Sequence, residues 1–198
     1  MAHDLSLTGV LLAGGAARRF GANKLLATLP TGQTVGLLAA AKLAAVVQRM
    51  LVVVRAEDDL TAAAFENAGY AVVRCVDAKL GMGHSLACGV AASRASAAWM
   101  VALADMPLIA PATLAALATC WRKEDRIVVP MYAGQAGHPV IFSARFGAEL
   151  LGLQGDRGAR PVLDAHRNDM LAFVTDDPGV LRDIDTLQDL ACASHPEP

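Results

Sequence analysis

Residues 7–24 read LTGVLLAGGAARRFGANK, and this stretch decides the fold class. Its apolar run, residues 7–13, is typical of a buried strand. The glycine pair at 14–15 leaves backbone N–H groups open to phosphate oxygens, because no Cβ obstructs their approach. The arginines at 18–19 and Lys24 add donors and positive charge. We therefore expect a strand followed by a cradle for a polyphosphate, such as the tail of a nucleoside triphosphate; a solvated surface loop is the alternative.

Strand-like and helix-like segments alternate beyond this stretch. The pattern predicts strands over 50–56, 70–76, 97–104 and 126–130, and helices over 35–49, 58–69, 82–95 and 111–121. Such alternation implies right-handed βαβ units and a mostly parallel sheet that is covered on both faces. We therefore predict one α/β domain, residues 1–198, with a Rossmann-like three-layer α/β/α sandwich. Ligands of such sheets bind beyond the carboxyl ends of the strands.

The C-terminal third follows a less regular pattern. Residues 133–142 predict a glycine-rich turn that leads into a strand, residues 155–167 a loop and then a helix, and residues 179–190 a short strand and then a helix. Thr186 lies near the expected start of the last helix, where a side-chain oxygen can accept from free backbone N–H groups.

The composition excludes several classes of protein. Of the 198 residues, 55% are hydrophobic and 18% are charged, and the net charge is −2. The chain can therefore bury a core, and it lacks the basic excess of a duplex-binding protein. The cysteines are irregularly spaced, which favours free thiols over a disulfide framework. The apolar run near the start is too short for a signal peptide or a membrane span. We expect a cytoplasmic protein that binds no nucleic acid and no membrane.

Two widespread phosphate-binding motifs are absent from the first loop. G-x-x-x-x-G-K-[ST] fails because Leu25 follows Lys24, and G-x-G-x-x-G fails because Gly14 and Gly15 are adjacent. Residues 12–24 instead resemble the signature L-A-[AG]-G-x-x-x-R-[MF]-G-x-x-K of nucleotidyltransferases that act on the molybdenum cofactor. Later segments resemble the cytidylyltransferase branch of that family, in order along nearly the whole chain: GMGHSL (81–86), ALADMP (102–107), GHPVIF (137–142), GDRGAR (155–160) and DIDTLQDL (183–190).

The resemblance implies the fold of the nucleotide-diphospho-sugar transferases and a set of functional residues. The residues that it implies for nucleotide binding are Leu12, Ala13, Gly14, Gly15, Arg19, Lys24, Gly81, Gly83 and Ser85. The catalytic residues that it implies are Arg19, Lys24 and Asp105. Arg19 and Lys24 are expected to clamp the triphosphate, and the loop at 81–86 is expected to contact the base and the ribose. We do not expect His84 to act as a catalyst.

Acidic residues predict a metal site. Asp105 follows an apolar strand, and a carboxylate there can hold Mg²⁺ while the ion bridges phosphates; an Asx-type turn before proline is the alternative. The resemblance implies that Asp105 is a Mg²⁺ ligand. Asp183 and Asp185 flank Ile184 and would point to the same side of a strand. The resemblance implies a second metal ligand at Asp185, whereas helix capping is the alternative for both.

The acceptor substrate is expected to bind the later motifs. Arg157 and Arg160 are suited to a second anion, and the resemblance places their region towards a pterin and its terminal phosphate. His138 is expected to donate to the pterin or to a phosphate. A solvated loop and a structural histidine are the corresponding alternatives.

The activity implied by the resemblance is transfer of CMP from CTP to the terminal phosphate of molybdenum-molybdopterin, with release of pyrophosphate. The spelling LAGG at 12–15 is usual in guanylyltransferases, where cytidylyltransferases usually have LAAG, so GTP is the alternative nucleotide. Transfer to another small phosphate, such as a methylerythritol phosphate, is a further alternative, and the late motifs count against it. A non-catalytic protein that delivers the cofactor to a recipient molybdoenzyme is the last, and the presence of Asp105 and Asp185 counts against it.

Overall fold

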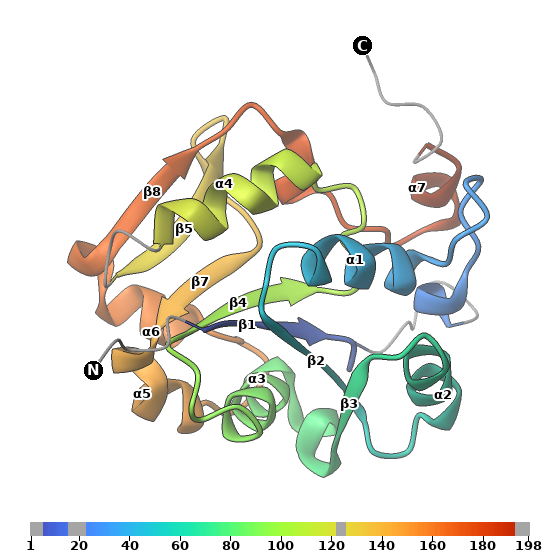
Figure 1. The fold of residues 1–198 in the computed structure, drawn as a ribbon, viewed down its shortest axis with the longest axis horizontal. Coiled ribbons are helices and arrows are strands. Elements are labelled where there is room, and N and C mark those ends of the chain that lie inside the picture. Colours follow the sequence, from blue (N-terminus) through green and yellow to red (C-terminus); the bar gives the residue numbers. More distant parts are fainter. Residues whose placement is uncertain (1–5, 16–22, 122–125, 193–198) are drawn as a thin grey trace.

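The computed structural model describes residues 6–15, 23–121 and 126–192, which form an eight-stranded sheet between layers of helices (Figure 1). The strands are β1 (Leu7–Leu12), β2 (Arg49–Arg55), β3 (Ala71–Cys75), β4 (Ala98–Leu103), β5 (Ile127–Tyr132), β6 (Gln135–Ala136), β7 (Val140–Ser143) and β8 (Met170–Val174). They follow the order β3-β2-β1-β4-β7-β5-β6, and β8 also pairs with β5. β3, β2, β1 and β4 are parallel, as are β5 and β8. The antiparallel strand β7 joins these two parts, so the predicted mostly parallel sheet is confirmed.

The helices are short and follow the strands along the chain. They are α1 (Val35–Ala44), α2 (Asp59–Asn67), α3 (Met82–Ala91), α4 (Pro111–Trp121), α5 (Gly147–Leu151), α6 (Arg160–Ala165) and α7 (Leu187–Cys192). Short 3₁₀ helices lie between these elements: η1 (Lys24–Leu26), η2 (Val76–Leu80), η3 (Ala144–Phe146), η4 (Arg167–Asp169) and η5 (Pro178–Leu181).

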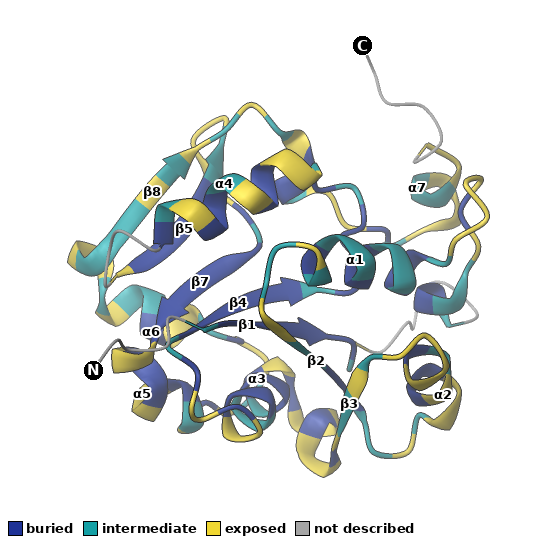
Figure 2. Ribbon diagram, viewed as in Figure 1, coloured by how far each residue is buried: buried dark blue, intermediate teal, exposed yellow. Residues whose placement is uncertain are grey.

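Two hydrophobic cores lie on opposite faces of the sheet. Leu7 and Leu11 of β1 pack on the face that α1, α2 and α4 cover, and Val10 and Leu12 pack on the face that α3, α5 and α6 cover. All residues of β1 are consequently buried (Figure 2). A strand covered on both faces needs an uninterrupted apolar run, because both sets of alternating side chains leave water. The predicted three-layer sandwich is therefore confirmed.

Two predicted helices are longer than the helices in the structure. The helix predicted over 35–49 ends at Ala44, and the helix predicted over 82–95 ends at Ala91. Beyond Ala91, the Ser93 hydroxyl donates to the Gly89 carbonyl oxygen at 2.8 Å. Serine side chains compete with the helix for backbone groups in this way, and the alanine-rich composition hides that competition.

The C-terminal third contains the main errors of the prediction. The short strand predicted at the start of 179–190 is wrong, because 178–181 form the 3₁₀ helix η5 and 182–185 have no regular structure. Asp177 caps η5, and its carboxylate accepts from the Gly179 N–H at 2.9 Å. Helix α5 and strand β8 were not predicted. Thr186 does begin α7, because its hydroxyl accepts from the Asp189 N–H at 3.2 Å.

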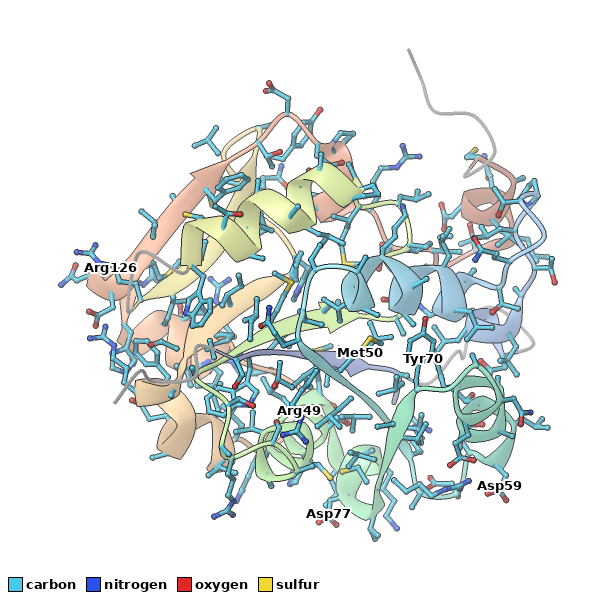
Figure 3. The ribbon with its side chains drawn as sticks, viewed as in Figure 1. Arg49, Met50, Asp59, Tyr70, Asp77 and Arg126 are labelled. Carbon is cyan, nitrogen blue, oxygen red and sulfur yellow. The ribbon has the colours of Figure 1, made fainter. Side chains whose placement is uncertain are left out.

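The charged residues Arg49, Asp59 and Asp77 are exposed, and Asp59 and Asp77 lie at the edge of the view in Figure 3. The free thiols predicted from the cysteine spacing are confirmed at Cys75, Cys88, Cys120 and Cys192. Within the part of the chain that the structure describes, no helix has the length and apolar character needed to cross a membrane.

Candidate active site

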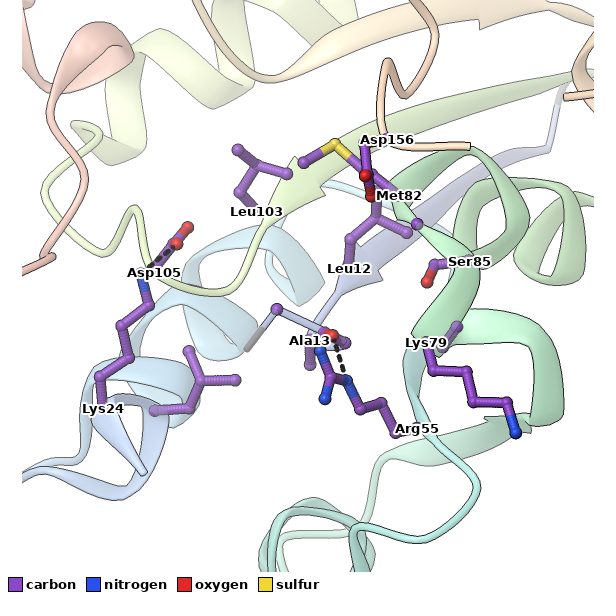
Figure 4. A pocket seen from close by; sticks show the side chains of 15 residues that line it. Leu12, Ala13, Lys24, Arg55, Lys79, Met82, Ser85, Leu103, Asp105 and Asp156 are labelled. Carbon is purple, nitrogen blue, oxygen red and sulfur yellow. Dashed lines mark hydrogen bonds and ion pairs between the residues drawn. The ribbon is translucent and has the colours of Figure 1, made fainter. Parts of the chain in front are cut away.

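A cavity of about 430 Å³ opens at the carboxyl ends of β1 and β4, beside the N-terminus of α3 (Figure 4). This is where a mostly parallel sheet is expected to bind its ligand. All the predicted nucleotide-binding residues line it except Gly83 and Arg19. Arg19 lies outside the described residues, together with Arg18. The wall also contains Arg55, Lys79, Met82 and Asp156, which the sequence analysis did not select.

Three carboxylates meet at Asp105, which lines one end of the cavity. Asp105 lies just beyond β4, and its carbonyl oxygen accepts from the Ile184 N–H at 2.8 Å. This bond holds Asp183 and Asp185, which flank Ile184, next to Asp105. The strand predicted for this segment is therefore not needed to bring the carboxylates together. One oxygen from each of the three carboxylates lies within 4.8 Å of the other two. Carboxylate oxygens at this spacing suit Mg²⁺ or Mn²⁺, so the residues present fit a divalent ion.

Lys24 faces these carboxylates. Its Nζ lies 2.7 Å from Oδ2 of Asp105 and 2.6 Å from Oδ1 of Asp185, and the residue is only 8% exposed. Burial alone would lower the pKa of Lys24, but hydrogen bonds to both carboxylates and their charges outweigh it and raise the pKa. Asn23 positions the turn, because its Nδ2 donates to Thr61 Oγ1 of α2 at 2.6 Å. Lys24 and Asp105 therefore share one cavity and form an ion pair.

The negative charge at this end is concentrated. Desolvation raises the pKa of Asp183, and the charges of Asp185 and Asp105 act in the same direction. Nearby Asp189 caps α7, where its carboxylate accepts from the Asp185 N–H at 3.1 Å. The capping function considered for Asp183 and Asp185 thus belongs to Asp189 and to Thr186, and the carboxylates of Asp183 and Asp185 turn to Asp105.

A second lysine supports the loop after β4. Lys42 of α1 donates to the carbonyl oxygens of Pro107, at 2.6 Å, and Ile109, at 2.9 Å. Burial lowers the pKa of Lys42, and the nearby Asp177 acts in the opposite direction. Asp177 in turn accepts from the Ala110 N–H at 2.8 Å. This network could not be predicted from the sequence, because the acceptors of Lys42 are backbone carbonyls, which leave no signature in residue type.

Small residues and two further cations form the other end of the cavity. A Cβ on Gly14 would lie 3.2 Å from Ser85 Oγ, so strand β1 and helix α3 approach closely here. Arg55, at the carboxyl end of β2, donates from Nε to the Gly14 carbonyl oxygen at 2.7 Å (Figure 4). Lys79 of η2 lines the same end. The position of Arg55 at the end of a parallel strand was the available signal for its place in the cavity.

The segment around Gly155 closes this end. Gly81 has a φ of +131°, and a Cβ there would collide with the backbone carbonyl of Gly155. Gly83 is buried against the Gln154 backbone, and its N–H donates to the Gly155 carbonyl oxygen at 2.8 Å. His84 Nδ1 accepts from the Gly155 N–H at 3.1 Å. The GMGHSL and GDRGAR motifs are therefore packed together, and Gly83 and His84 hold that contact.

We expect Gly81→Ala to destabilise the fold by about 2–4 kcal/mol, because it combines a strained backbone with a collision against Gly155. Gly69→Ala is the matched control: Gly69 has a φ of +85° but no atom within 4 Å of its missing Cβ. Its expected cost is about 1–2 kcal/mol, from the backbone alone. Urea unfolding at 25 °C measures both. Equal losses in the two variants would show that the contact with Gly155 contributes nothing.

A smaller cavity of about 180 Å³ adjoins the first. The two cavities share the side chains of Leu12, Met82 and Leu103. The predicted acceptor residues His138, Arg157 and Arg160 all line the smaller one.

The three nitrogen-bearing side chains around the smaller cavity differ in how far they are buried. Burial lowers the pKa of His138, with the Asp105 charge and a hydrogen bond to Val101 acting in the opposite direction. His138 Nδ1 is buried and has no hydrogen-bond partner among the described residues. Arg157 and Arg160 are more exposed, and both pair with Asp164, at 3.1 and 3.2 Å. The apolar wall thus carries a neutral imidazole, and the guanidinium groups lie at the solvent side.

Comparison with known proteins identifies the family. Residues 9–170 match the MobA-like NTP transferase domain, which covers most of the chain. The chain belongs to this family. The purine catabolism protein PucB of Bacillus subtilis strain 168 is 33% identical to this MobA-like chain over 195 residues, covering 91% of the chain and 92% of PucB. The resemblance deduced from the motifs is therefore confirmed at the level of the family.

Solved structures of other proteins share the fold. The crystal structure of Rv0371c from Mycobacterium tuberculosis H37Rv matches the MobA-like chain with a TM-score of 0.82 at 26% identity, covering 96% of this chain and 97% of that one. A structure of Rv0371c in complex with manganese matches with a TM-score of 0.78 at 27% identity, covering 95% and 97%. Molybdopterin-guanine dinucleotide biosynthesis protein A from Archaeoglobus fulgidus, at 18% identity and a TM-score of 0.68 over 94% and 96%, shares the fold. As a MobA-like protein, the chain is a nucleotidyltransferase that uses a nucleoside triphosphate.

Proposed function

We propose that the chain transfers CMP from CTP to the terminal phosphate of molybdenum-molybdopterin, with a divalent ion, Mg²⁺ in the cell, on Asp105 and Asp185. The observation that carries this proposal is the convergence of Lys24, Asp105 and Asp185 at one end of a cavity whose wall continues along the glycine backbone of residues 14–15. Cations and carboxylates at one end suit a metal-bound triphosphate, and the open backbone suits its phosphate oxygens.

In this reaction an oxygen of the acceptor phosphate attacks the α-phosphorus, the bond to the β-phosphate oxygen breaks, and pyrophosphate leaves. The nucleophile is already an anion near neutral pH, so the residues need to align it and balance charge rather than remove a proton. Lys24 is assigned to the triphosphate, and Arg19 to the same phosphates from the first loop. A divalent ion on Asp105 and Asp185 would neutralise the charge that develops on the phosphates.

The second cavity suits the acceptor. It shares a wall with the first, so a phosphate bound there would lie next to the nucleotide. His138, Arg157 and Arg160 provide one buried and two exposed nitrogen-bearing groups around an otherwise apolar wall. Such a wall suits a heterocycle, with the guanidinium groups on an attached anion. We therefore assign this cavity to the pterin and its phosphate.

Gly14 is the residue in the first loop that bears on the choice between CTP and GTP. In LAGG proteins a glycine stands where LAAG proteins have alanine, and here an alanine Cβ would lie 3.2 Å from Ser85 Oγ. That distance is tighter than an ordinary contact, so packing against α3 also favours a glycine here. The sequence LAGG in place of LAAG is therefore weak evidence that GTP is the substrate. The later motifs, which resemble the cytidylyltransferase branch, favour CTP.

Pyrophosphate release decides the substrates. Each of the four nucleoside triphosphates is incubated with the chain and Mg²⁺, with and without molybdenum-molybdopterin. We expect release only when the acceptor is present, and at least about tenfold faster with CTP than with GTP, the factor that about 1.4 kcal/mol of discrimination provides. Faster turnover of GTP would make the chain a guanylyltransferase. If pyrophosphate were released only with a different acceptor phosphate, molybdenum-molybdopterin would not be the acceptor.

A further inference from the structure

Lys24 occupies the place that a metal ion of the proposed reaction needs. Its ammonium group contacts Asp105 at 2.7 Å and Asp185 at 2.6 Å. A Mg²⁺ ion on the same carboxylates would lie at about 2.1 Å from their oxygens. An ion on the second oxygen of either carboxylate would still be close to the ammonium group. Two cations that close repel in a partly buried site, so Lys24 and the ion compete for these carboxylates.

The cavity gives Lys24 another place to go. Its side chain lines the same cavity as Gly14 and Gly15, where the phosphates of a nucleotide are proposed to lie. Lysine is a compact charge on a flexible stem, so it can turn from the carboxylates to a phosphate without movement of the backbone. The backbone of the turn is itself held, because Asn23 bonds to Thr61 of α2 at 2.6 Å.

We propose that Lys24 is the counter-ion of Asp105 and Asp185 in the free protein, and that the divalent ion enters as a metal–nucleotide complex while Lys24 moves to the triphosphate. This inference rests on the proposed function and adds an order of binding to it. Binding of the nucleotide frees the carboxylates, so nucleotide and metal ion strengthen each other's binding by the same factor. The free chain consequently has little affinity for the metal ion alone.

The test is titration of the free chain with Mn²⁺, with unbound Mn²⁺ counted by electron paramagnetic resonance. Lys24→Met keeps the length of the side chain and removes the charge. We expect it to bind Mn²⁺ at least about tenfold more tightly than the wild type in the absence of nucleotide. Lys79→Met is the matched control, because it removes one positive charge from the same cavity wall away from the carboxylates, and we expect wild-type Mn²⁺ affinity. Equal affinity in wild type and Lys24→Met would overturn the inference.

Two further measurements make the result specific. The double variant Lys24→Met with Asp105→Asn is expected to lose the gain in Mn²⁺ affinity, which ties the ion to Asp105; a retained gain would contradict the inference. If Lys24→Met does not fold, the wild type alone decides. Calorimetry then compares the CTP dissociation constant with and without Mn²⁺, and we expect a difference of at least about tenfold. No difference would overturn the inference. Absence of binding by both CTP and GTP, with Mn²⁺ present, would instead overturn the proposed function.

Discussion

Asp105→Asn is expected to lower metal-dependent nucleotidyl transfer by about 10³-fold or more, because it removes the charge at the centre of the carboxylate cluster. Asparagine has nearly the shape of aspartate and keeps the backbone carbonyl that accepts from the Ile184 N–H, so the loop after β4 is expected to stay in place. The measurement is pyrophosphate release over a range of Mg²⁺ and Mn²⁺ concentrations. The variant should require much more metal ion and still reach a lower maximum rate.

Asp59→Asn is the control for this prediction. Asp59 is exposed on α2, where it pairs with Arg74 at 2.7 Å, outside both cavities. The same chemical change there is expected to leave the rate and the metal requirement within about twofold of the wild type, as is usual for surface substitutions. If Asp105→Asn kept the metal requirement of the wild type, the metal ion would have to bind elsewhere and the proposed centre would be wrong.

The N-terminal part of the fold could be predicted because local pattern and tertiary structure agree there. The run from Leu7 to Ala13 is apolar except for Thr8 and does not alternate, which suits a strand with helices on both faces. The C-terminal part was harder because its elements are defined by distant partners. β8 pairs with β5, more than 30 residues earlier, and 182–185 are held by the loop after β4 rather than by their own pattern. No short window of sequence contains those partners.

The candidate site divides in the same way. The loops that carry Lys24 and Asp105 were predicted to lie at the ligand-binding edge of the sheet, because both loops follow parallel strands. The functions of the two residues came from the resemblance. Asp185 came from the resemblance, since its own pattern suggested only a strand or a cap. Arg55 and Lys42 were missed because each donates to a backbone carbonyl, at Gly14 and in the loop after β4. The sequence can indicate an ion pair, because both partners are charged residue types. It does not indicate a bond to a backbone carbonyl, because every residue has one.

Lys24→Met is expected to slow nucleotidyl transfer by roughly 10²–10³-fold, the usual loss for one electrostatic donor to a developing charge. We expect this loss although the variant binds free Mn²⁺ more tightly. The reason is that Lys24 contacts the carboxylates in the free protein and the triphosphate during the reaction. Rate and metal affinity should therefore change in opposite directions, which a general loss of structure would not produce. Pyrophosphate release at saturating CTP and Mg²⁺ measures the rate.

The control is Arg74→Met, which removes an exposed cation outside the cavities and is expected to leave the rate within about twofold. If Lys24→Met turned over within a few-fold of the wild-type rate, the proposal that Lys24 binds the triphosphate would be wrong. A slow reaction combined with unchanged Mn²⁺ affinity would mean that Lys24 binds the triphosphate during the reaction. It would also mean that Lys24 does not compete with the metal ion for the carboxylates of the free protein. Opposite changes in rate and affinity are the result expected if the ammonium group leaves Asp105 and Asp185 as the metal–nucleotide complex arrives.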